Sequence, residues 1–94
     1  MSMAYKVVPT PNFEKDLKKI GKSNAIKIIK WIDSNLENSQ NPREKGKQLK
    51  YDFKEYWRYR IGDFRLLAEI IDGKLMLSLI TVAHRREVYK KNKV

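Results

Sequence analysis

The chain has 94 residues and 41% hydrophobic content, which suffices for one domain with a modest core and not for two. Its 21 Lys and Arg outnumber its 11 Asp and Glu, and the net charge of +10 attracts polyanions: nucleic acid, an anionic membrane surface or an acidic protein. With no cysteine and one histidine, disulfides, thiolate metal sites and imidazole clusters are excluded. We therefore expect residues 1–94 to form a single domain without a metal or cofactor.

The beginning of the chain gives no targeting signal. Residues 1–8 contain no basic segment followed by a long apolar run, and no part of the chain approaches the ~20 apolar residues that span a bilayer. The absence of cysteine also fits a reducing compartment. We expect a cytoplasmic protein that is neither exported by a standard signal nor membrane-spanning.

The first half of the sequence predicts a strand and then a helix. Residues 4–8 alternate apolar and polar side chains and stop at Pro9, as a short β-strand does. Thr10 and Pro11 then supply a helix cap and a first-turn proline, and apolar residues at helical spacing continue until Gly21. A short amphipathic helix is expected there.

A second helix is expected directly afterwards. Ser23 can cap it, and its apolar stripe consists of Ala25, Ile28, Ile29, Ile32 and Leu36. The two helices should form an antiparallel hairpin. Residues 37–47 are polar and contain Asn41-Pro42 and Gly46, so they predict a loop.

The second half predicts a three-stranded antiparallel meander, with strands at residues 56–61, 64–71 and 74–84. The dipeptides Gly62-Asp63 and Asp72-Gly73 separate these runs, and such pairs are typical of two-residue hairpin turns. A two-residue turn fixes the register of the strands that it joins. We therefore expect Ile61 to face Phe64 and Ile71 to face Lys74.

This register sorts the side chains of the sheet onto two faces. One face is almost wholly apolar and should lie on the helix hairpin; it carries Trp57, Tyr59, Ile61, Phe64, Leu66, Ala68, Ile70, Leu75, Leu77 and Leu79. The opposite face is polar; it carries Tyr56, Arg58, Arg60, Arg65, Leu67, Glu69, Met76, Ser78, Ile80 and His84. The place of His84 assumes that the last strand runs regularly to its end, and a bulge in either hairpin would change the pairing.

Cations concentrate on the polar face. Arg60 should lie directly opposite Arg65, with Arg58 one step along, although facing like charges destabilise a strand pair. These guanidiniums favour phosphate binding, because each is a planar donor fork that stays charged at any relevant pH. The alternative is a solvated sheet face that Glu69 partly neutralises.

The last predicted strand ends in the block His84-Arg85-Arg86-Glu87-Val88-Tyr89. Cleavage of a phosphodiester needs charge stabilisation on the non-bridging oxygens and proton transfer at the attacking and leaving oxygens. Arginine can supply the first, and histidine or tyrosine the second. A histidine at a strand end is also a common surface or packing residue, so both interpretations stay open.

Three blocks together resemble one family along nearly the whole chain. They are Gly46-x-x-Leu49-Lys50, the run from Tyr56 to Leu66 that reads YWRYRIGDFRL, and the block from His84 to Tyr89. They are similar to the RelE branch of the RelE/ParE toxin superfamily. The resemblance implies an α+β, RelE-like βααβββ fold, with an N-terminal strand and a helix hairpin packed on one face of a mainly antiparallel sheet.

The resemblance also implies a function. The expected protein is the toxin of a type II toxin–antitoxin pair, a ribosome-dependent endoribonuclease that cleaves mRNA in the A site through attack by the mRNA's own 2′-hydroxyl, without a metal. Its expected partners are the ribosome, mRNA and an acidic RelB-like antitoxin, with which it forms a hetero-oligomer. Two alternatives remain: a ParE-like toxin that poisons gyrase, which the C-terminal block argues against, and a non-catalytic RNA-binding module.

Roles for individual residues follow from the same resemblance. Arg65 and Arg85 are expected to bind the scissile phosphate, Arg58 to handle substrate or protons, and Tyr89 to stack on or orient the substrate base. His84 is expected to be the general acid or base. That identity stays open, because Tyr56 and Lys47 stand where some members of the family have a lysine and a glutamate. The residues expected to contact RNA phosphates on the ribosome are Lys47, Lys50, Lys54, Arg60, Arg86, Lys90 and Lys91.

Overall fold

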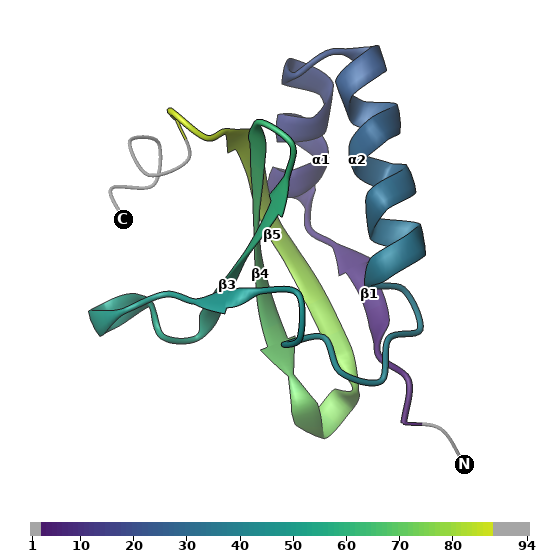
Figure 1. Ribbon diagram of the computed structural model, residues 1–94, viewed down its shortest axis with the longest axis vertical. Coiled ribbons are helices and arrows are strands. Elements are labelled where there is room, and N and C mark those ends of the chain that lie inside the picture. Colours follow the sequence, from purple (N-terminus) through teal and green to yellow (C-terminus); the bar gives the residue numbers. More distant parts are fainter. Residues whose placement is uncertain (1–2, 88–94) are drawn as a thin grey trace.

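The computed structural model describes residues 3–87, in which two helices cover one face of a five-stranded sheet (Figure 1). The elements in chain order are β1 (Lys6–Pro9), α1 (Pro11–Lys19), α2 (Lys22–Asn35), β2 (Lys47–Gln48), the short helix η1 (Tyr51–Phe53), β3 (Tyr56–Ile61), β4 (Phe64–Ile71), the short helix η2 (Asp72–Lys74) and β5 (Met76–His84). The strand order is β1-β5-β4-β3-β2; β1 is parallel to β5, and the other neighbouring pairs are antiparallel. This arrangement confirms the expected α+β fold.

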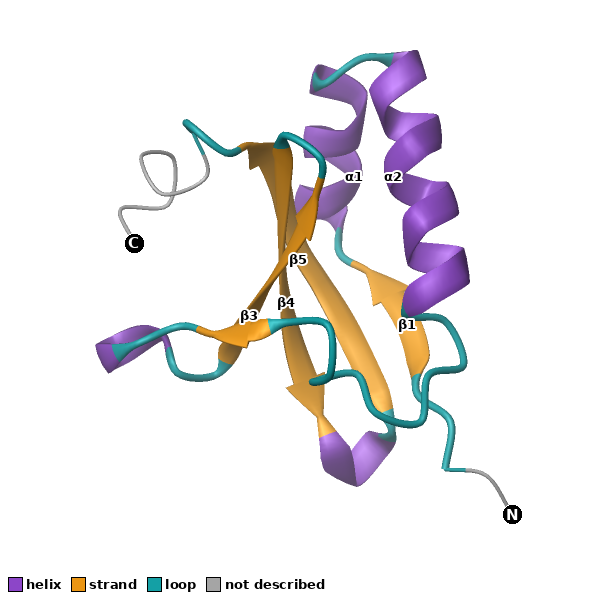
Figure 2. Cartoon of the chain, in the orientation of Figure 1, coloured by secondary structure: helices purple, strands orange, loops and turns teal. Residues whose placement is uncertain are grey.

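The main core lies between the helix pair and the sheet. Figure 2 shows both long helices on the same side of the strands, which leaves the other side of β3, β4 and β5 without a helix over it. The buried members of this core are Phe13, Ile28, Ile32, Leu36, Tyr59, Ile61, Leu66, Ala68, Leu77, Leu79 and Val82. None of the helices within residues 3–87 is long and apolar enough to cross a membrane.

The first helix begins as the sequence predicts, because the Thr10 hydroxyl accepts a hydrogen bond from the Phe13 N–H at 3.2 Å. The strand before it lies later than predicted, at Lys6–Pro9 rather than residues 4–8, since these four residues pair with β5. Pro9 is tolerated there because β1 is an edge strand.

The prediction that Ser23 caps the second helix is wrong. Gly21 is the N-cap, and its carbonyl accepts the Ala25 N–H at 2.9 Å. Gly21 has a φ of 91°, a backbone conformation that residues with a side chain rarely adopt. This conformation allows the chain to pass directly from α1 into α2.

The end of the predicted loop forms a short strand. Residues 37–46 form the loop, but Lys47 and Gln48 pair with Arg58 and Trp57 as β2. The end of the loop is fastened to the core: the Tyr59 hydroxyl donates to the Pro42 carbonyl at 2.5 Å, and a Cβ on Gly46 would meet the Tyr59 ring at 2.7 Å. The loop therefore delivers β2 to the edge of the sheet.

The two hairpins differ in how far the sequence predicts them. The first is confirmed, with Ile61 opposite Phe64 across Gly62-Asp63. The second is wrong, because Ile71 pairs with Met76 and not with Lys74. Asp72–Lys74 forms η2, and Leu75 follows it with a φ of 48° and donates its N–H to the Asp72 carbonyl at 3.1 Å. Leu75 therefore lies in the turn and not on the apolar face.

The last strand contains a bulge, so the regular strand on which the predicted place of His84 depends is not found. Leu79 pairs with Ala68 and Thr81 pairs with Leu67, which leaves Ile80 as an extra residue. The bulge is held from α1: the Thr10 hydroxyl donates to the carbonyl of Leu79 at 2.8 Å. Residues after the bulge consequently lie on the opposite face of the sheet from the one that a regular strand would give them.

Two further contacts join α1 to this irregular stretch. The Asn12 side-chain amide donates to the Ile80 carbonyl at 2.9 Å. The Thr81 hydroxyl donates to the carboxylate of Asp16, and both of these side chains are buried. Asn12 also donates to Asp16, at 3.3 Å. The bulge is thus a docking point for the helix, which explains why its polar groups can be buried.

Candidate functional site

The side of the sheet that the helices leave uncovered carries the cations, and we call it the open face. Its members are assigned from the strand pairings and include Lys47, Tyr56, Arg58, Arg60, Arg65, Leu67, Glu69, Met76, Ser78 and Ala83. Two of its rows carry the cations: Lys47 lies beside Arg58 and Leu67, and Arg60 lies beside Arg65 and Ala83. The predicted Arg60–Arg65 juxtaposition is confirmed, and Lys47 of β2 extends the row of cations.

The centre of the open face is apolar. Leu67 and Ala83 are only 2% and 5% exposed, and they form a small cluster that Leu49 covers from the segment after β2. Arg58 and Arg65 are half-buried, while Arg60 and Lys47 are exposed. The cationic residues of the open face therefore border a buried apolar cluster.

Arg65 and Arg85 meet at the first hairpin turn. The Arg65 guanidinium folds back and donates to the carbonyls of Gly62 and Phe64, both at 2.9 Å. The Arg85 backbone N–H donates to the Asp63 carbonyl in the same turn at 2.7 Å, and its side chain is exposed. The Arg65 side chain and the Arg85 backbone are thus attached to the same turn, and these are the two residues that the family resemblance assigns to the scissile phosphate.

His84 lies on the other side of the sheet, contrary to the expectation that it shares a face with the arginines. The bulge places it opposite Phe64, and the two rings meet edge to face with centroids 5.8 Å apart. Together with Asp16, Lys19 and other residues it lines a hollow of about 260 Å³ next to α1.

The histidine has a defined contact in that position. The Arg86 backbone N–H donates to His84 Nδ1 at 3.2 Å, and the Glu87 N–H donates to the His84 carbonyl at 2.8 Å. Both bonds close the turn that carries Arg85 and Arg86. His84 is therefore built into the support of the arginine turn and does not point into the cation row.

Of the remaining predicted site residues, some lie within the described part of the chain and some lie outside it. Lys47, Lys50, Lys54, Arg60 and Arg86 are exposed. Tyr89, Lys90 and Lys91 lie outside the described residues. Within residues 3–87, no three His, Asp or Glu side chains are grouped as metal ligands.

Tyr59, Tyr56 and Glu69 are titratable groups on β3 and β4, the strands that also carry Arg58, Arg60 and Arg65. Burial raises the pKa of Tyr59 to about 12, so this hydroxyl stays protonated and serves the loop contact. Tyr56 pairs with Glu69 on the open face, one step along from Arg58 and Leu67. This pair adds a half-exposed carboxylate and phenol next to the cations, which sequence reasoning treated only as members of the face.

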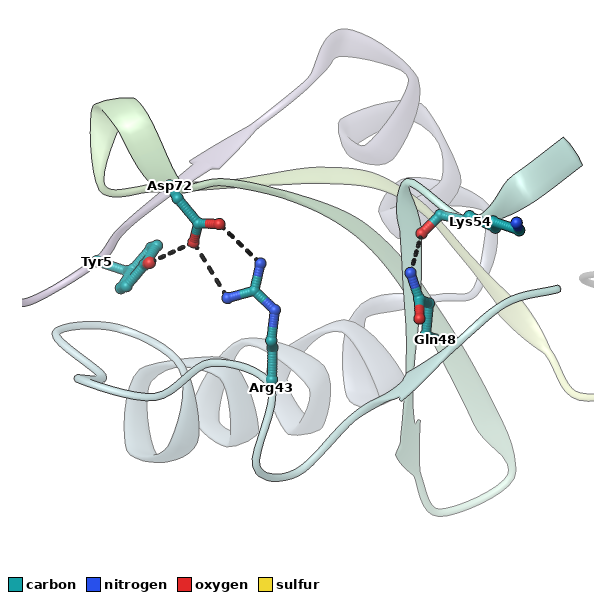
Figure 3. Close-up of polar contacts among 5 residues, drawn as sticks. All are labelled: Tyr5, Arg43, Gln48, Lys54 and Asp72. Carbon is teal, nitrogen blue, oxygen red and sulfur yellow. Dashed lines mark hydrogen bonds and ion pairs between the residues drawn. The ribbon is translucent and has the colours of Figure 1, made fainter. Parts of the chain in front are cut away.

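A second arginine centre, which sequence reasoning missed, lies at the far end of the sheet (Figure 3). Arg43 forms a two-pronged ion pair with Asp72, with Nη1 and Nη2 at 3.1 and 2.8 Å from its two carboxylate oxygens. The Tyr5 hydroxyl donates to the same carboxylate at 2.5 Å. We call these three residues the clamp, since they join the segment just before β1, the loop before β2 and the turn between β4 and β5.

The charges of the clamp shift one another's protonation. Hydrogen bonds from Arg43, and then from Tyr5, hold the pKa of Asp72 below its usual value. The hydrogen bond to Asp72 raises the pKa of Tyr5 and that of Arg43. The Arg43 guanidinium also lies 5.6 Å from the centre of the Trp57 ring.

Comparison with known proteins gives concordant matches over most of the chain. Residues 7–89 match the family described as ParE toxin of type II toxin-antitoxin system, parDE. A curated relative, Toxin RelE of Mycobacterium tuberculosis, is 30% identical over 88 residues, which cover 94% of this chain and 89% of that protein.

Solved structures agree with this result. The RelBE2 toxin–antitoxin complex from Mycobacterium tuberculosis contains a chain with a TM-score of 0.79 and 27% identity, covering 87% of this chain and 99% of that one. A mutant of the E. coli toxin RelE in the free state has a TM-score of 0.73 over 95% of this chain and 92% of that one. Its identity is 19%, so the second likeness concerns the fold.

Proposed function

Because the chain belongs to the RelE-type toxins of the RelE/ParE superfamily of type II toxin–antitoxin systems, we propose that it is a ribosome-dependent endoribonuclease that cleaves mRNA in the A site. The observation that carries this proposal is the convergence of Arg65 and Arg85 on one turn, beside Arg60 and Arg58. A cluster of like charges is costly for folding and useful for holding a phosphodiester.

The proposed reaction uses the substrate's own nucleophile. The 2′-hydroxyl of the nucleotide before the cut attacks the adjacent phosphorus and expels the 5′-oxygen of the next nucleotide, which leaves a 2′,3′-cyclic phosphate. Arg65 and Arg85 hold the non-bridging oxygens and stabilise the negative charge that grows on them in the transition state. Arg58 lies in the neighbouring row of the open face and orients the substrate or assists proton transfer.

His84 takes a different part in this proposal from the one that the sequence suggests. Its ring lies against Phe64 on the helix side, and its Nδ1 accepts the Arg86 N–H. We assign it to positioning the Arg85–Arg86 turn. The open face itself offers Tyr56 and Glu69 for proton transfer beside the arginines. We also propose that Tyr89, outside the described residues, stacks on the substrate base.

The decisive experiment is to induce the chain in cells and map the 5′ ends of transcripts. We expect translation to stop and mRNAs to be cut within codons on ribosomes, while purified naked RNA is cut poorly. On programmed ribosomes, cleavage products should end in a cyclic phosphate, and a chelator that leaves the ribosomes intact should not slow the cut. Intact transcripts in arrested cells would refute the proposal.

A second candidate is a toxin that acts on gyrase, and the observation in its favour is the matched family, whose description names ParE. The same induced cells separate the two. A gyrase poison should produce DNA damage alongside intact mRNA, whereas an endoribonuclease should leave DNA unbroken. A module that binds RNA without cutting it should slow growth without new 5′ ends.

We also propose an acidic, RelB-like antitoxin as the partner. The relative of known structure with a TM-score of 0.79 is, by its description, part of a toxin–antitoxin complex. The net charge of +10 favours an acidic segment that crosses the open face. Measuring the dissociation constant across a salt series tests this, because an electrostatic contribution should weaken binding as salt rises. Salt-independent binding would argue against it.

A further inference from the structure

Tyr51 is the most exposed large hydrophobic side chain of the described residues, at 83%. It has a φ of 58°, a left-handed conformation that a bulky side chain rarely adopts. Folding gains little from an aromatic ring in water, and the backbone at this position would suit glycine. A strained and exposed aromatic residue is therefore better explained by a contact outside the chain.

The loop that presents Tyr51 is braced at its base. The Leu49 N–H donates to the Tyr56 carbonyl at 3.0 Å, and the Phe53 N–H donates to the Lys50 carbonyl at 3.2 Å. The Gln48 side chain donates to the Lys54 carbonyl at 2.8 Å, as Figure 3 shows. These bonds close residues 50–54 into a compact turn that projects away from the helices (Figure 1). The ring is therefore held out on a preorganised support.

The surroundings of the ring fit a nucleotide. An open hollow of about 710 Å³, a size usual for small-ligand sites, is lined by Gln48, Leu49, Lys50, Tyr51, Asp52 and Lys54. Two of these residues are exposed lysines suited to phosphates, and one is an acid. Unpaired bases stack on exposed aromatic rings because every base has a flat π face.

This hollow continues the open face. Leu49 lines the hollow and also covers Leu67 at the centre of the open face. Lys47, two residues earlier, lies beside Arg58 across the β2–β3 pairing. A single strand of RNA that passes from Arg65 in one row to Arg58 and Lys47 in the neighbouring row therefore continues toward the hollow that Tyr51 lines.

We infer that Tyr51 is a stacking platform for an unpaired base of single-stranded RNA, whose flanking phosphates lie on Lys50 and Lys54. This inference rests on the proposed action on mRNA and assigns to the same surface a second contact, outside the cutting residues. This surface suits a base better than a protein partner. A base with its flanking phosphates requires one ring face and two cations, whereas a peptide would require a groove.

The test uses the full chain and a short single-stranded RNA in which 2-aminopurine reports stacking by loss of its fluorescence. Tyr51→Gly should bind this RNA roughly tenfold more weakly than the wild-type protein and quench less. Tyr51→Phe should bind within about twofold of wild type, because it keeps the ring. The melting temperature of Tyr51→Gly should equal or exceed that of wild type, because glycine relieves the backbone strain.

Asn38→Gly provides the matched control. It also replaces a residue with positive φ, 63°, but in the loop after α2, so RNA binding should not change. Equal RNA binding by wild type and Tyr51→Gly overturns the inference, as does a loss confined to antitoxin binding. Cleavage on programmed ribosomes is measured in parallel. If the wild-type protein cleaves and Tyr51→Gly binds RNA as tightly as wild type, the stacking inference fails and the proposed function stands. If the wild-type protein quenches 2-aminopurine but does not cleave, the proposed function fails and the stacking inference stands.

Discussion

Arginine has opposite surroundings at the two ends of this sheet. In the clamp, Arg43 faces the carboxylate of Asp72 and the pair joins three segments of the chain. On the open face, Arg60 faces Arg65, and Arg65 bonds to the carbonyls of its own turn. The clamp contributes to folding, whereas the open face concentrates positive charge that an anion can neutralise.

The largest effect is expected from removing a phosphate-binding arginine. Arg65→Ala and Arg85→Ala should each slow cleavage on programmed ribosomes about 100-fold or more, because each removes charge stabilisation from the transition state. Both proteins should keep the wild-type circular dichroism spectrum. Lys30→Ala, which removes an exposed cation from α2, is the control and should cleave normally. Full activity of both arginine variants would remove the open face from the mechanism.

A smaller effect is expected at His84 and tests positioning against proton transfer. His84→Asn keeps an acceptor near the place of Nδ1 and should cut within about threefold of wild type, whereas His84→Ala should be slower by about tenfold. The pH profile of His84→Asn should match that of wild type. If His84→Asn is as slow as His84→Ala and the profile loses a limb, His84 is the general acid or base.

At the other end, Arg43→Ala should lower the melting temperature by about 2–4 °C, since an exposed ion pair contributes little but this one joins three segments. Cleavage per folded molecule should remain at the wild-type level. The measurement is thermal unfolding beside a cleavage assay below the transition. A large loss of cleavage with an unchanged melting temperature would mean that the two ends are not separate in function.

The smallest expected effect is on the pH dependence of the melting temperature. The pKa of Asp72 is lowered in the folded protein from its ordinary value of 3.8, so its contribution to stability is complete above that value and is lost as the pH falls through the lowered pKa. The gap in melting temperature between wild type and Asp72→Asn should therefore be constant near neutral pH and narrow below 3.8. A gap that persists at the lowest pH would exclude the ion pair as its cause.

The sequence predicts the parts of the site that short-range signals determine. The first hairpin has two turn residues, Gly62 and Asp63, and that turn alone fixes Arg60 opposite Arg65. Asp72-Gly73 gives the same kind of signal, yet the turn there includes Lys74 and Leu75, because Leu75 adopts a left-handed conformation. Local sequence does not distinguish these two outcomes.

Long-range contacts determine the rest. The bulge at Ile80 is held by Thr10 and Asn12, 70 and 68 residues away in sequence, and it carries no mark of its own within β5. The position of His84 depends on this bulge, so the alternation of side chains in a regular strand predicts the wrong face for the ring. β2 is only Lys47–Gln48, too short and polar for an alternating pattern to show.

The bulge has a consequence for how chains of this kind can vary in length. Ile80 is one residue more than the facing strand requires, so a chain without it would still pair Thr81 with Leu67 and keep His84 opposite Phe64. Such a chain would keep the Leu79 carbonyl, to which Thr10 donates, and would lose the Ile80 carbonyl, to which Asn12 donates. The strand can therefore lose this one residue without exchanging its two sides, and the expected cost falls on the attachment of the helix.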